Sequence, residues 1–366
     1  MKIIAFYLPQ FHTFPENDAW WGKGFTEWTN TKKAVPLFPG HYQPHIPKDN
    51  KYYDLVLDES TMQDQIKMAK DYGVDAFCYY HYWFANGKKL MEKPIERMLA
   101  DKTLDMPFCL CWANENWSRR WDGSEAAVLI HQDYDDEAGW VDHFNYLCTY
   151  FKDRRYLKDK HGRPILLIYK PQLISDLEKH LDTWRNMAEQ AGFPGLCLVC
   201  QYPQYSTDVE KAFDYHLSFE PITTTGSVQD NFMKAWKISP QQTIEVCITK
   251  FLHTTKLRSY KKYSYANTVE ASMRRPMRDK ELLCAFPCWD NTARRKKNAI
   301  VYYDSTPDLF EKYVEAQLNK TKQIGQEKML FINAWNEWAE GAHLEPDEKF
   351  GMRYLEALKN AKQKIN

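Results

Sequence analysis

The sequence has no excess of charge of either sign, because 49 lysines and arginines balance 49 aspartates and glutamates. Proteins that bind nucleic acid or an anionic membrane surface usually carry a basic excess. We therefore expect no nucleic acid among the partners of this protein and favour small or neutral ligands. With 44% hydrophobic and 27% charged residues over 366 positions, the chain can bury a full core.

Long apolar runs are also missing. The opening segment MKIIAFYLPQF has one lysine and a short apolar stretch before Pro9, which fits neither a signal peptide nor a spanning helix. No other segment reaches the length needed to cross a bilayer. On these grounds we expect no membrane span and a cytoplasmic protein.

The nine cysteines are an odd number, and five of them lie inside apolar, strand-like runs. We interpret these five as small buried side chains in a reducing compartment. Cys197 and Cys200 have the CxxC spacing of metal and redox sites, but no second pair or nearby histidine accompanies them. We expect no metal ion and no organic cofactor.

What the sequence does contain is a regular alternation of short apolar strands and amphipathic helices. Trp140, Phe144, Leu147 and Phe151 share one helical face. Ser60 with Gln63 predicts a capping box, and Thr306 followed by Pro307 predicts a cap and first helical residue. The predicted strands are Ile3–Tyr7, Ala76–Tyr80, Phe108–Trp112, Pro164–Tyr169, Leu196–Gln201, Tyr215–Phe219, Leu283–Pro287 and Met329–Asn333.

Eight such units predict an α/β fold, a (β/α)8 TIM barrel with catalytic loops at the C-terminal ends of the strands. A doubly wound open sheet is the alternative, but no GxGxxG motif follows any predicted strand. We expect a single domain over residues 1–366. The stretch of about 221–281, between the sixth and seventh strands, is too long for an ordinary connection and predicts a helical insertion.

Two carboxylates, Glu337 and Glu340, follow the last predicted strand within the segment NAWNEWAEGAHLEPD. If Asn336 to Glu340 form a helical turn, these acids share a face, with Cβ atoms about 5 to 6 Å apart. Two close carboxylates cannot both ionise easily, so one serves as an acid and the other as a base. Cleavage of a glycosidic bond needs this division, so we predict that both are catalytic.

Polar and aromatic residues also follow the other strands, where the barrel would bring them to one face. Such a rim stacks sugar rings on indoles and binds hydroxyl groups, although any single tryptophan or histidine there can instead be structural. The predicted substrate-binding residues are Tyr7, Gln10, His12, Trp28, His81, Trp83, Trp112, Asn114, Glu115, Trp117, Lys170, Gln201, Trp289, Asp290, Asn291, Arg294, Asn333, Trp335 and Asn336.

The insertion and the segment after Trp289 are rich in cations, namely Arg258, Lys261, Lys262, Arg274, Arg275, Arg278 and Arg294 to Lys297. A solvated helical surface is the interpretation we favour. The sharper hypothesis is that these cations attract an anionic glycan or a diphosphate-linked carrier to the barrel mouth.

Several long motifs follow one another over nearly the whole chain, namely YLPQFH with ENDAWWGKGFTEWTN, CWANENW, WDNTARR and NAWNEWAEGAHLEP. Together they resemble the WbsX family, which is related to glycoside hydrolase family 99. The resemblance implies a (β/α)8 barrel that works on cell-surface polysaccharide of O-antigen or capsule type. Members of the family are often described as glycosyltransferases.

Family 99 enzymes are endo-acting retaining mannosidases, and the resemblance implies their mechanism through a 1,2-anhydro sugar. It assigns Glu337 as the base toward the sugar 2-hydroxyl and Glu340 as general acid/base. Ala339 stands where the family 99 motif has histidine, which puts mannose specificity in doubt. We thus predict a retaining glycoside hydrolase or transglycosylase.

Two alternatives stay open. A nucleotide-sugar glycosyltransferase would need a nucleotide pocket or a metal site, and the only hint is the DxD motif of Asp133 and Asp135, which precedes a helix where acids favour the dipole. An inactive carbohydrate-binding barrel would keep the aromatic residues, but it would not need both Glu337 and Glu340.

Overall fold

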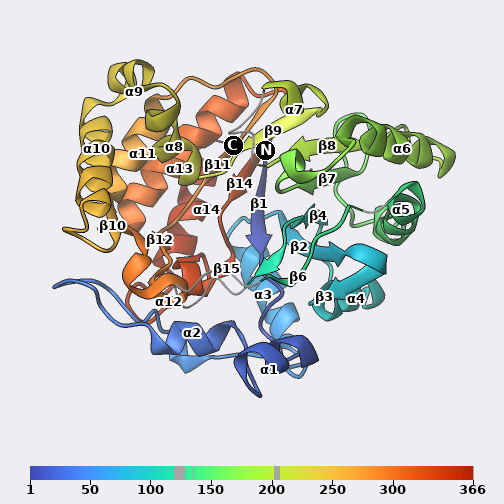
Figure 1. The fold of residues 1–366 in the computed structure, drawn as a ribbon, viewed down its shortest axis with the longest axis horizontal. Helices are drawn as coiled ribbons and strands as arrows, with labels where there is room; N and C mark the ends of the chain where they lie inside the picture. Colours follow the sequence, from blue (N-terminus) through green and yellow to red (C-terminus); the bar gives the residue numbers. More distant parts are fainter. Residues whose placement is uncertain (119–127, 135, 202–206, 366) are drawn as a thin grey trace.

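The structure is a computed structural model that describes residues 1–118, 128–134, 136–201 and 207–365. Its centre is a closed barrel of eight parallel strands, in which β1 is hydrogen-bonded to both β14 and β2 (Figure 1). In order around the barrel the strands are β1 (Lys2–Tyr7), β14 (Met329–Ile332), β11 (Glu281–Ala285), β9 (Tyr215–Ser218), β8 (Cys197–Cys200), β7 (Ile165–Ile168), β4 (Phe108–Trp112) and β2 (Ala76–Phe84).

The predicted (β/α)8 barrel is confirmed, and each predicted strand overlaps an observed one. The largest difference is in β2, which runs past the barrel to Phe84 because its end pairs with β3 (Lys88–Leu90) in an antiparallel hairpin. Inside the barrel, Phe6 of β1 packs against Phe219, which follows β9, with ring centroids 5.4 Å apart. Both rings are buried, and Phe219 forms part of the floor of the cavity described below.

Helices connect the strands and cover the outside of the barrel, with α9 to α11 and α13 on one side and α5 and α6 on the other (Figure 1). The helices are α1 (Pro15–Trp21), α2 (Glu27–Lys33), α3 (Thr61–Asp71), α4 (Lys93–Ala100), α5 (Glu137–Phe151), α6 (Leu177–Gln190), α7 (Thr207–Lys211), α8 (Ile222–Asp230), α9 (Phe232–Ile238), α10 (Pro240–Thr254), α11 (Tyr265–Arg274), α12 (Thr292–Arg295), α13 (Pro307–Gln323) and α14 (Arg353–Ile365).

Three small sheets lie in the connections that follow barrel strands. They are β5 (Trp117–Ser118) with β6 (Val128–Ile130), β15 (Asn336–Glu337) with β16 (Ala342–His343), and the three-stranded sheet β10 (Lys261–Ser264), β13 (Ile300–Tyr303) and β12 (Trp289–Asp290). Their backbone hydrogen bonds connect the loops that follow the barrel strands.

Helix boundaries agree only in part with the sequence signals. The Thr306 side chain accepts a hydrogen bond from the Leu309 amide, and Pro307 is the first residue of α13, as predicted. The predicted capping box at Ser60 is wrong, because Ser60 has helical dihedral angles and its hydroxyl contacts the Asp64 carboxylate instead of a backbone amide.

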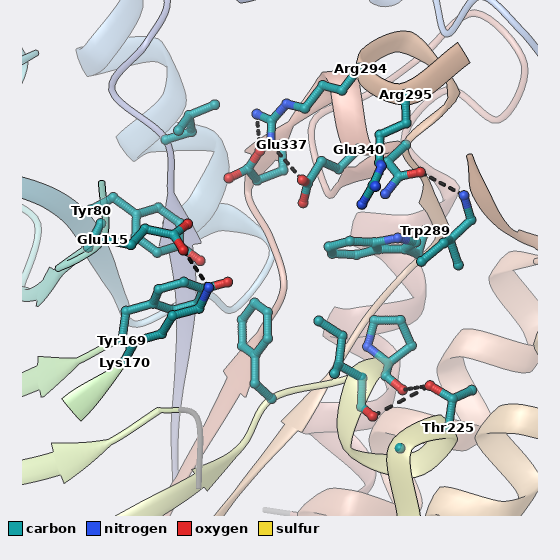
Figure 2. A pocket seen from close by; sticks show the side chains of 18 of the residues that line it. Tyr80, Glu115, Tyr169, Lys170, Thr225, Trp289, Arg294, Arg295, Glu337 and Glu340 are labelled. Atoms are coloured by element: carbon teal, nitrogen blue, oxygen red, sulfur yellow. Dashed lines mark hydrogen bonds and ion pairs between the residues drawn. The ribbon is translucent and has the colours of Figure 1, made fainter. Parts of the chain in front are cut away.

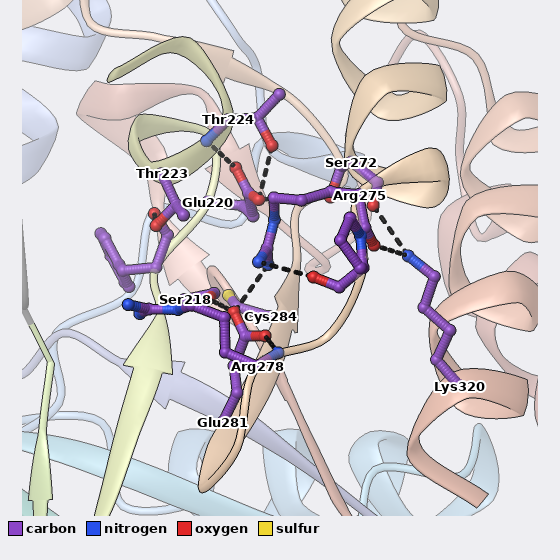
Figure 3. Close-up of polar contacts among 12 residues, drawn as sticks. Ser218, Glu220, Thr223, Thr224, Ser272, Arg275, Arg278, Glu281, Cys284 and Lys320 are labelled. Carbon is purple, nitrogen blue, oxygen red and sulfur yellow. Dashed lines mark hydrogen bonds and ion pairs between the residues drawn. The ribbon is translucent and has the colours of Figure 1, made fainter. Parts of the chain in front are cut away.

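The stretch 221–281 contains α8, α9, α10, β10 and α11. Polar contacts tie it to the barrel beside the amino end of β11, where the Arg275 guanidinium lies 2.7 Å from the buried Glu281 carboxylate (Figure 3). Lys320 of α13 donates to the backbone oxygens of Ser272 and Arg275 at 3.0 and 2.8 Å.

This network bears on the hypothesis that the basic residues attract a glycan. Arg275 is engaged with Glu281, and Arg274 with Glu270 at 2.5 Å. Both arginines precede the amino end of β11, whereas the cavity opens at the carboxyl ends of the strands. Arg274 and Arg275 do not line the cavity, whereas Lys261 and Arg295 do, so the hypothesis stays a prediction that now concerns Lys261 and Arg295.

Candidate active site

A cavity of about 610 Å³ opens at the carboxyl ends of the barrel strands (Figure 2). Its lining combines charged residues with a set of tyrosine and tryptophan rings. Nine of the residues predicted from the sequence line it: Gln10, Glu115, Trp117, Lys170, Trp289, Asn291, Arg294, Glu337 and Glu340.

The two predicted catalytic acids meet at one guanidinium group. Arg294 donates from Nη2 to Glu337 Oε2 at 2.8 Å and from Nη1 to Glu340 Oε1 at 2.6 Å. The same arginine donates from Nε and Nη2 to Glu27 Oε1 at 2.8 and 2.5 Å. Three carboxylates therefore share one cation, and the two acids of the cavity are held side by side (Figure 2).

Local backbone geometry explains how the acids reach this position. Glu337 lies in β15, which pairs with β16, and Glu340 ends the single 3-10 turn Trp338–Glu340 between them. The turn closes at Gly341, which has φ of 61°, and a Cβ atom there would approach Asp290 to 3.1 Å. A glycine is required at this position on both grounds. The predicted helical turn is thus a short 3-10 turn in a hairpin.

Burial and charge set the protonation of this cluster. Burial, with a smaller effect from the neighbouring carboxylates Glu340 and Glu27, raises the pKa of Glu337 to about 8 against the opposing effect of Arg294. Burial likewise raises the pKa of Glu27, which is fully inaccessible. One proton shared within the cluster at neutral pH is the expected result, since one guanidinium cannot balance three ionised carboxylates.

Glu27 was not among the residues predicted from the sequence. It stands at the start of α2, in a connection that follows β1, and it accepts from Nε and Nη2 of Arg294, the second of which also donates to Glu337. The signal available was an acid between Phe25 and Trp28, two aromatic residues of an otherwise polar loop. Its partner is 267 residues away, so no spacing rule connects them.

Tyrosines of the cavity wall were also missed. Tyr80 and Tyr82 come from the end of β2, two residues apart, so both side chains point to the same side of the strand. Tyr169, Tyr263 and Tyr302 complete the set, from the ends of β7, β10 and β13. Side chains two residues apart in a strand point to the same side, and this rule, applied to the end of the predicted strand, could have identified Tyr80 and Tyr82.

An ion pair between Lys170 Nζ and Glu115 Oε2 lies across the cavity from Arg294 (Figure 2). The predicted residue Asn114 holds it in place, because its side-chain amide donates to the Lys170 carbonyl at 2.8 Å and accepts from the Lys170 amide at 2.7 Å. Asn114 itself is buried and does not line the cavity.

The two predicted histidines are packed outside the cavity lining. His12 Nδ1 lies 3.0 Å from the Pro9 carbonyl oxygen, and His81 Nε2 lies 2.9 Å from His143 Nε2. Burial lowers the pKa of both, to about 3 for His81. Both imidazoles are therefore neutral, buried groups with protein partners.

Three predicted tryptophans are also buried outside the cavity lining. Trp28 donates from its indole to the Tyr53 carbonyl at 2.8 Å, and Trp112 donates to the Trp83 carbonyl at 3.2 Å. Trp83 stacks on His143 with 4.6 Å between ring centroids. The structure places these indoles in packing roles, because their rings are covered by neighbouring side chains.

The other predicted residues lie beneath or behind the rim, each buried and none lining the cavity. Tyr7 donates to Gln65, Gln201 accepts from the Cys111 thiol, and Asn333 donates to the Glu220 carbonyl. The side-chain amide of Asn336 accepts a hydrogen bond from the Leu8 amide and donates one to the Leu8 carbonyl. The Asp290 carboxylate accepts a hydrogen bond from Gln43 and contacts His41, both at 2.6 Å. Trp335 is fully inaccessible to solvent.

Residues that could hold a metal ion lie outside this cavity. His45, His343 and Asp347 bring one ligand atom each to within 4.8 Å of one another. Cys197 and Cys200, with the CxxC spacing, are buried in β8 and form no disulfide. Of the DxD motif, Asp135 lies outside the described residues. No helix of the described chain is long and apolar enough to cross a membrane.

Comparison with known proteins adds a family and a fold. The family described as Glycosyltransferase WbsX matches residues 3–358. Two proteins from strains of Xanthomonas campestris pv. campestris, each called "Uncharacterized protein WxcX", are 37% and 38% identical over 98% of this chain. This chain spans about half the length of these curated relatives, 49% in each case.

Among solved structures, a glycoside hydrolase-like protein has a TM-score of 0.57 at 13% identity, with 98% of this chain and 93% of that chain covered. The GH99 endo-alpha-mannosidase from Bacteroides thetaiotaomicron has a TM-score of 0.55 at 13% identity, with coverages of 99% and 97%. At this identity the likeness shows a shared barrel fold.

Proposed function

The chain belongs to the WbsX family, and from that premise and the geometry of the cavity we propose that it is a retaining glycoside hydrolase or transglycosylase acting on a surface polysaccharide. The observation that carries the proposal is the pair of carboxylates, Glu337 and Glu340, joined by Arg294 at the mouth of a barrel. The aromatic and polar lining of the cavity supports a sugar ligand.

The proposed chemistry follows the family 99 resemblance. Glu337 takes the proton of the sugar 2-hydroxyl, O2 attacks C1 to form a 1,2-anhydro sugar, and Glu340 gives a proton to the departing oxygen. In the second step Glu340 takes a proton from water, which opens the three-membered ring at C1, and O2 regains its proton from Glu337. Both groups end in their starting protonation states.

Arg294 has a positioning role in this scheme. Its two terminal nitrogens hold one acid each, so the acids keep their relative positions while the sugar changes. The positive charge also favours the ionised form of Glu337, which is the form that acts as a base. Because the raised pKa of Glu337 makes its carboxylate scarce near neutral pH, that carboxylate is a strong base when it forms.

Kinetics of two amide variants test the proposal. Glu337→Gln and Glu340→Gln should each lower kcat by at least about 1,000-fold, with little change in Tm, since both groups act mainly in the transition state. A dinitrophenyl oligosaccharide, whose leaving group needs no proton, should restore turnover only in Glu340→Gln. Glu59→Gln, an exposed acid far from the cavity, is the matched control.

The anomeric configuration of the first product distinguishes a retaining enzyme, and the type of donor substrate distinguishes it from a glycosyltransferase. NMR should show that the anomeric configuration of the substrate is retained, with water or an added sugar as acceptor. Turnover that requires a nucleotide sugar would contradict the proposal and support a glycosyltransferase, as the family description reads. Full activity in both amide variants on the same oligosaccharide would also contradict it.

A further inference from the structure

A second, smaller cavity of about 80 Å³ lies behind the hairpin that carries the acids. Its lining includes His45, from the loop before α3, together with His343 of β16 and Asp347. These three residues are only 3–6% exposed, and one ligand atom of each lies within 4.8 Å of the others. None of them lines the large cavity, so the proposed glycosidic chemistry does not use them.

Hydrogen bonds fix the orientation of the histidines. His343 Nδ1 lies 2.8 Å from the Glu345 carbonyl oxygen, so this nitrogen must carry a proton and donate it. The lone pair of His343 is then on Nε2, which faces His45 Nδ1 at 2.8 Å. A backbone carbonyl that holds the far nitrogen of a histidine is the usual outer partner of a metal-bound imidazole.

A lysine, Lys349, also lines this cavity, but no ion pair joins it to the carboxylate of the site. No lysine, arginine or histidine nitrogen of the described residues forms an ion pair with the Asp347 carboxylate, which accepts a hydrogen bond from the Phe350 amide at 2.6 Å. A buried carboxylate without a cation is costly, and a bound cation would remove that cost.

We propose that His45, His343 and Asp347 form a structural site for a divalent transition metal, with zinc as the best match to two imidazoles and one carboxylate. Zinc binds such ligands at about 2.0–2.2 Å in a tetrahedral arrangement. The nitrogens of His45 and His343 must separate by a few tenths of an ångström to bind one ion, and the proton of His45 moves to Nε2. A water molecule takes the fourth position.

The position of the site indicates a structural role for the metal ion. His343 pairs with Asn336, the residue before Glu337, across the hairpin of β15 and β16. His45 belongs to a loop 298 residues earlier in the chain. The ion therefore joins that loop to the hairpin and restricts movement of the catalytic acid. The site is a positioning element, since its ligands do not reach the large cavity.

Cobalt titration of the full chain tests the proposal, after EDTA treatment and removal of the chelator. We expect one equivalent of Co²⁺ to produce visible d–d absorption, and one equivalent of Zn²⁺ to abolish it. Zn²⁺ should also raise the Tm of the metal-free protein. Affinity for Zn²⁺ should fall in His343→Asn and Asp347→Asn by at least the 10–100-fold that loss of an outer partner costs.

His161→Asn, which alters an exposed histidine, is the matched control and should bind like the unaltered chain. The proposal is overturned if the unaltered protein shows no stoichiometric Co²⁺ absorption and no change of Tm with Zn²⁺. Undiminished binding in both His343→Asn and Asp347→Asn would overturn it as well. The titration of the unaltered chain decides the matter even if a variant fails to fold.

Discussion

The pH dependence of kcat/KM should report the ionisation of Glu337 and change when Glu27 is replaced by glutamine. In the proposed mechanism the pair of acids must hold one proton, which Glu340 donates while Glu337 acts as a base, so kcat/KM should fall as the pH rises through the pKa of about 8, where the pair loses that proton. At pH 7 about nine molecules in ten would then still hold the proton.

The magnitude of the Glu27 effect follows from the shared arginine. Glu27 Oε1 and Glu337 Oε2 accept from the same Nη2 at 2.5 and 2.8 Å, so these oxygens are at most about 5 Å apart. Two unit charges at that distance repel by roughly 3 kcal/mol at an effective dielectric constant of about 20. Charge is spread over four oxygens, so we expect the midpoint to fall by about one to two pH units in Glu27→Gln.

Glutamine keeps the acceptor oxygen that Arg294 uses, so the guanidinium can stay in place. At pH 7 the expected loss in kcat/KM is about twofold for a shift of one unit and about tenfold for two. The assay is kcat/KM for one oligosaccharide at low substrate concentration between pH 5 and 9.5, with Tm recorded for each variant. Glu59→Gln, which removes an exposed acid, should leave the midpoint unchanged.

Two results would refute this reasoning. An unchanged midpoint in Glu27→Gln, with a normal Tm, would mean that the charge of Glu27 does not act on Glu337. A kcat/KM that rises through pH 8 would mean that the fully ionised pair is the active form, which contradicts the role of Glu340 as proton donor.

Three further predictions concern packing, charge and stability. Trp117→Ala, at the cavity wall, should weaken oligosaccharide binding in titrations with little change in Tm. Trp28→Ala should instead destabilise the fold by about 3–5 kcal/mol, measured by calorimetry. Lys261→Glu should weaken binding of an anionic glycan and reduce the salt dependence of that binding, whereas Arg274→Glu, which does not alter the cavity lining, should do neither. If the unaltered protein binds the glycan with equal affinity in titrations at low and high salt, this prediction is contradicted. Burial raises the pKa of Glu345 to about 7, so the stability that its bound proton contributes is complete below about pH 4.5 and is lost as the pH rises through 7. Between pH 5 and 8, the Tm of Glu345→Gln should therefore fall less than the Tm of the unaltered chain. Parallel plots of Tm against pH for the two proteins would contradict this prediction.

The sequence alone was sufficient to predict the barrel fold and the proximity of the two acids. Most barrel strands, such as β4, β7 and β14, are short, fully buried runs, and a buried run between turn signals is recognisable from its residues alone. Glu337 and Glu340 are three residues apart, so their proximity is a local property of the chain. Motif order over nearly the whole chain was sufficient for the family.

Only the tertiary structure decided which side chains face the cavity. Trp28 and Trp117 both follow strands and are both aromatic, yet one is covered by the ring of Trp338 and the other lines the cavity. A strand end has an inward and an outward side, and outside a regular strand the sequence does not say which side a loop residue takes. Predicted rim residues such as His81 are consequently buried among other side chains.

The protonation of the acids was likewise decided by contacts between distant residues. Arg294 meets Glu27 across 267 residues and Glu337 across 43. Burial raises the pKa of Glu337, Arg294 opposes this effect, and the carboxylates of Glu340 and Glu27 add to it. The same holds for His45 and His343, which no metal-binding spacing could connect. Local properties follow from neighbouring residues in the chain, whereas electrostatics depends on distances and solvent exclusion, which exist only once the chain has folded.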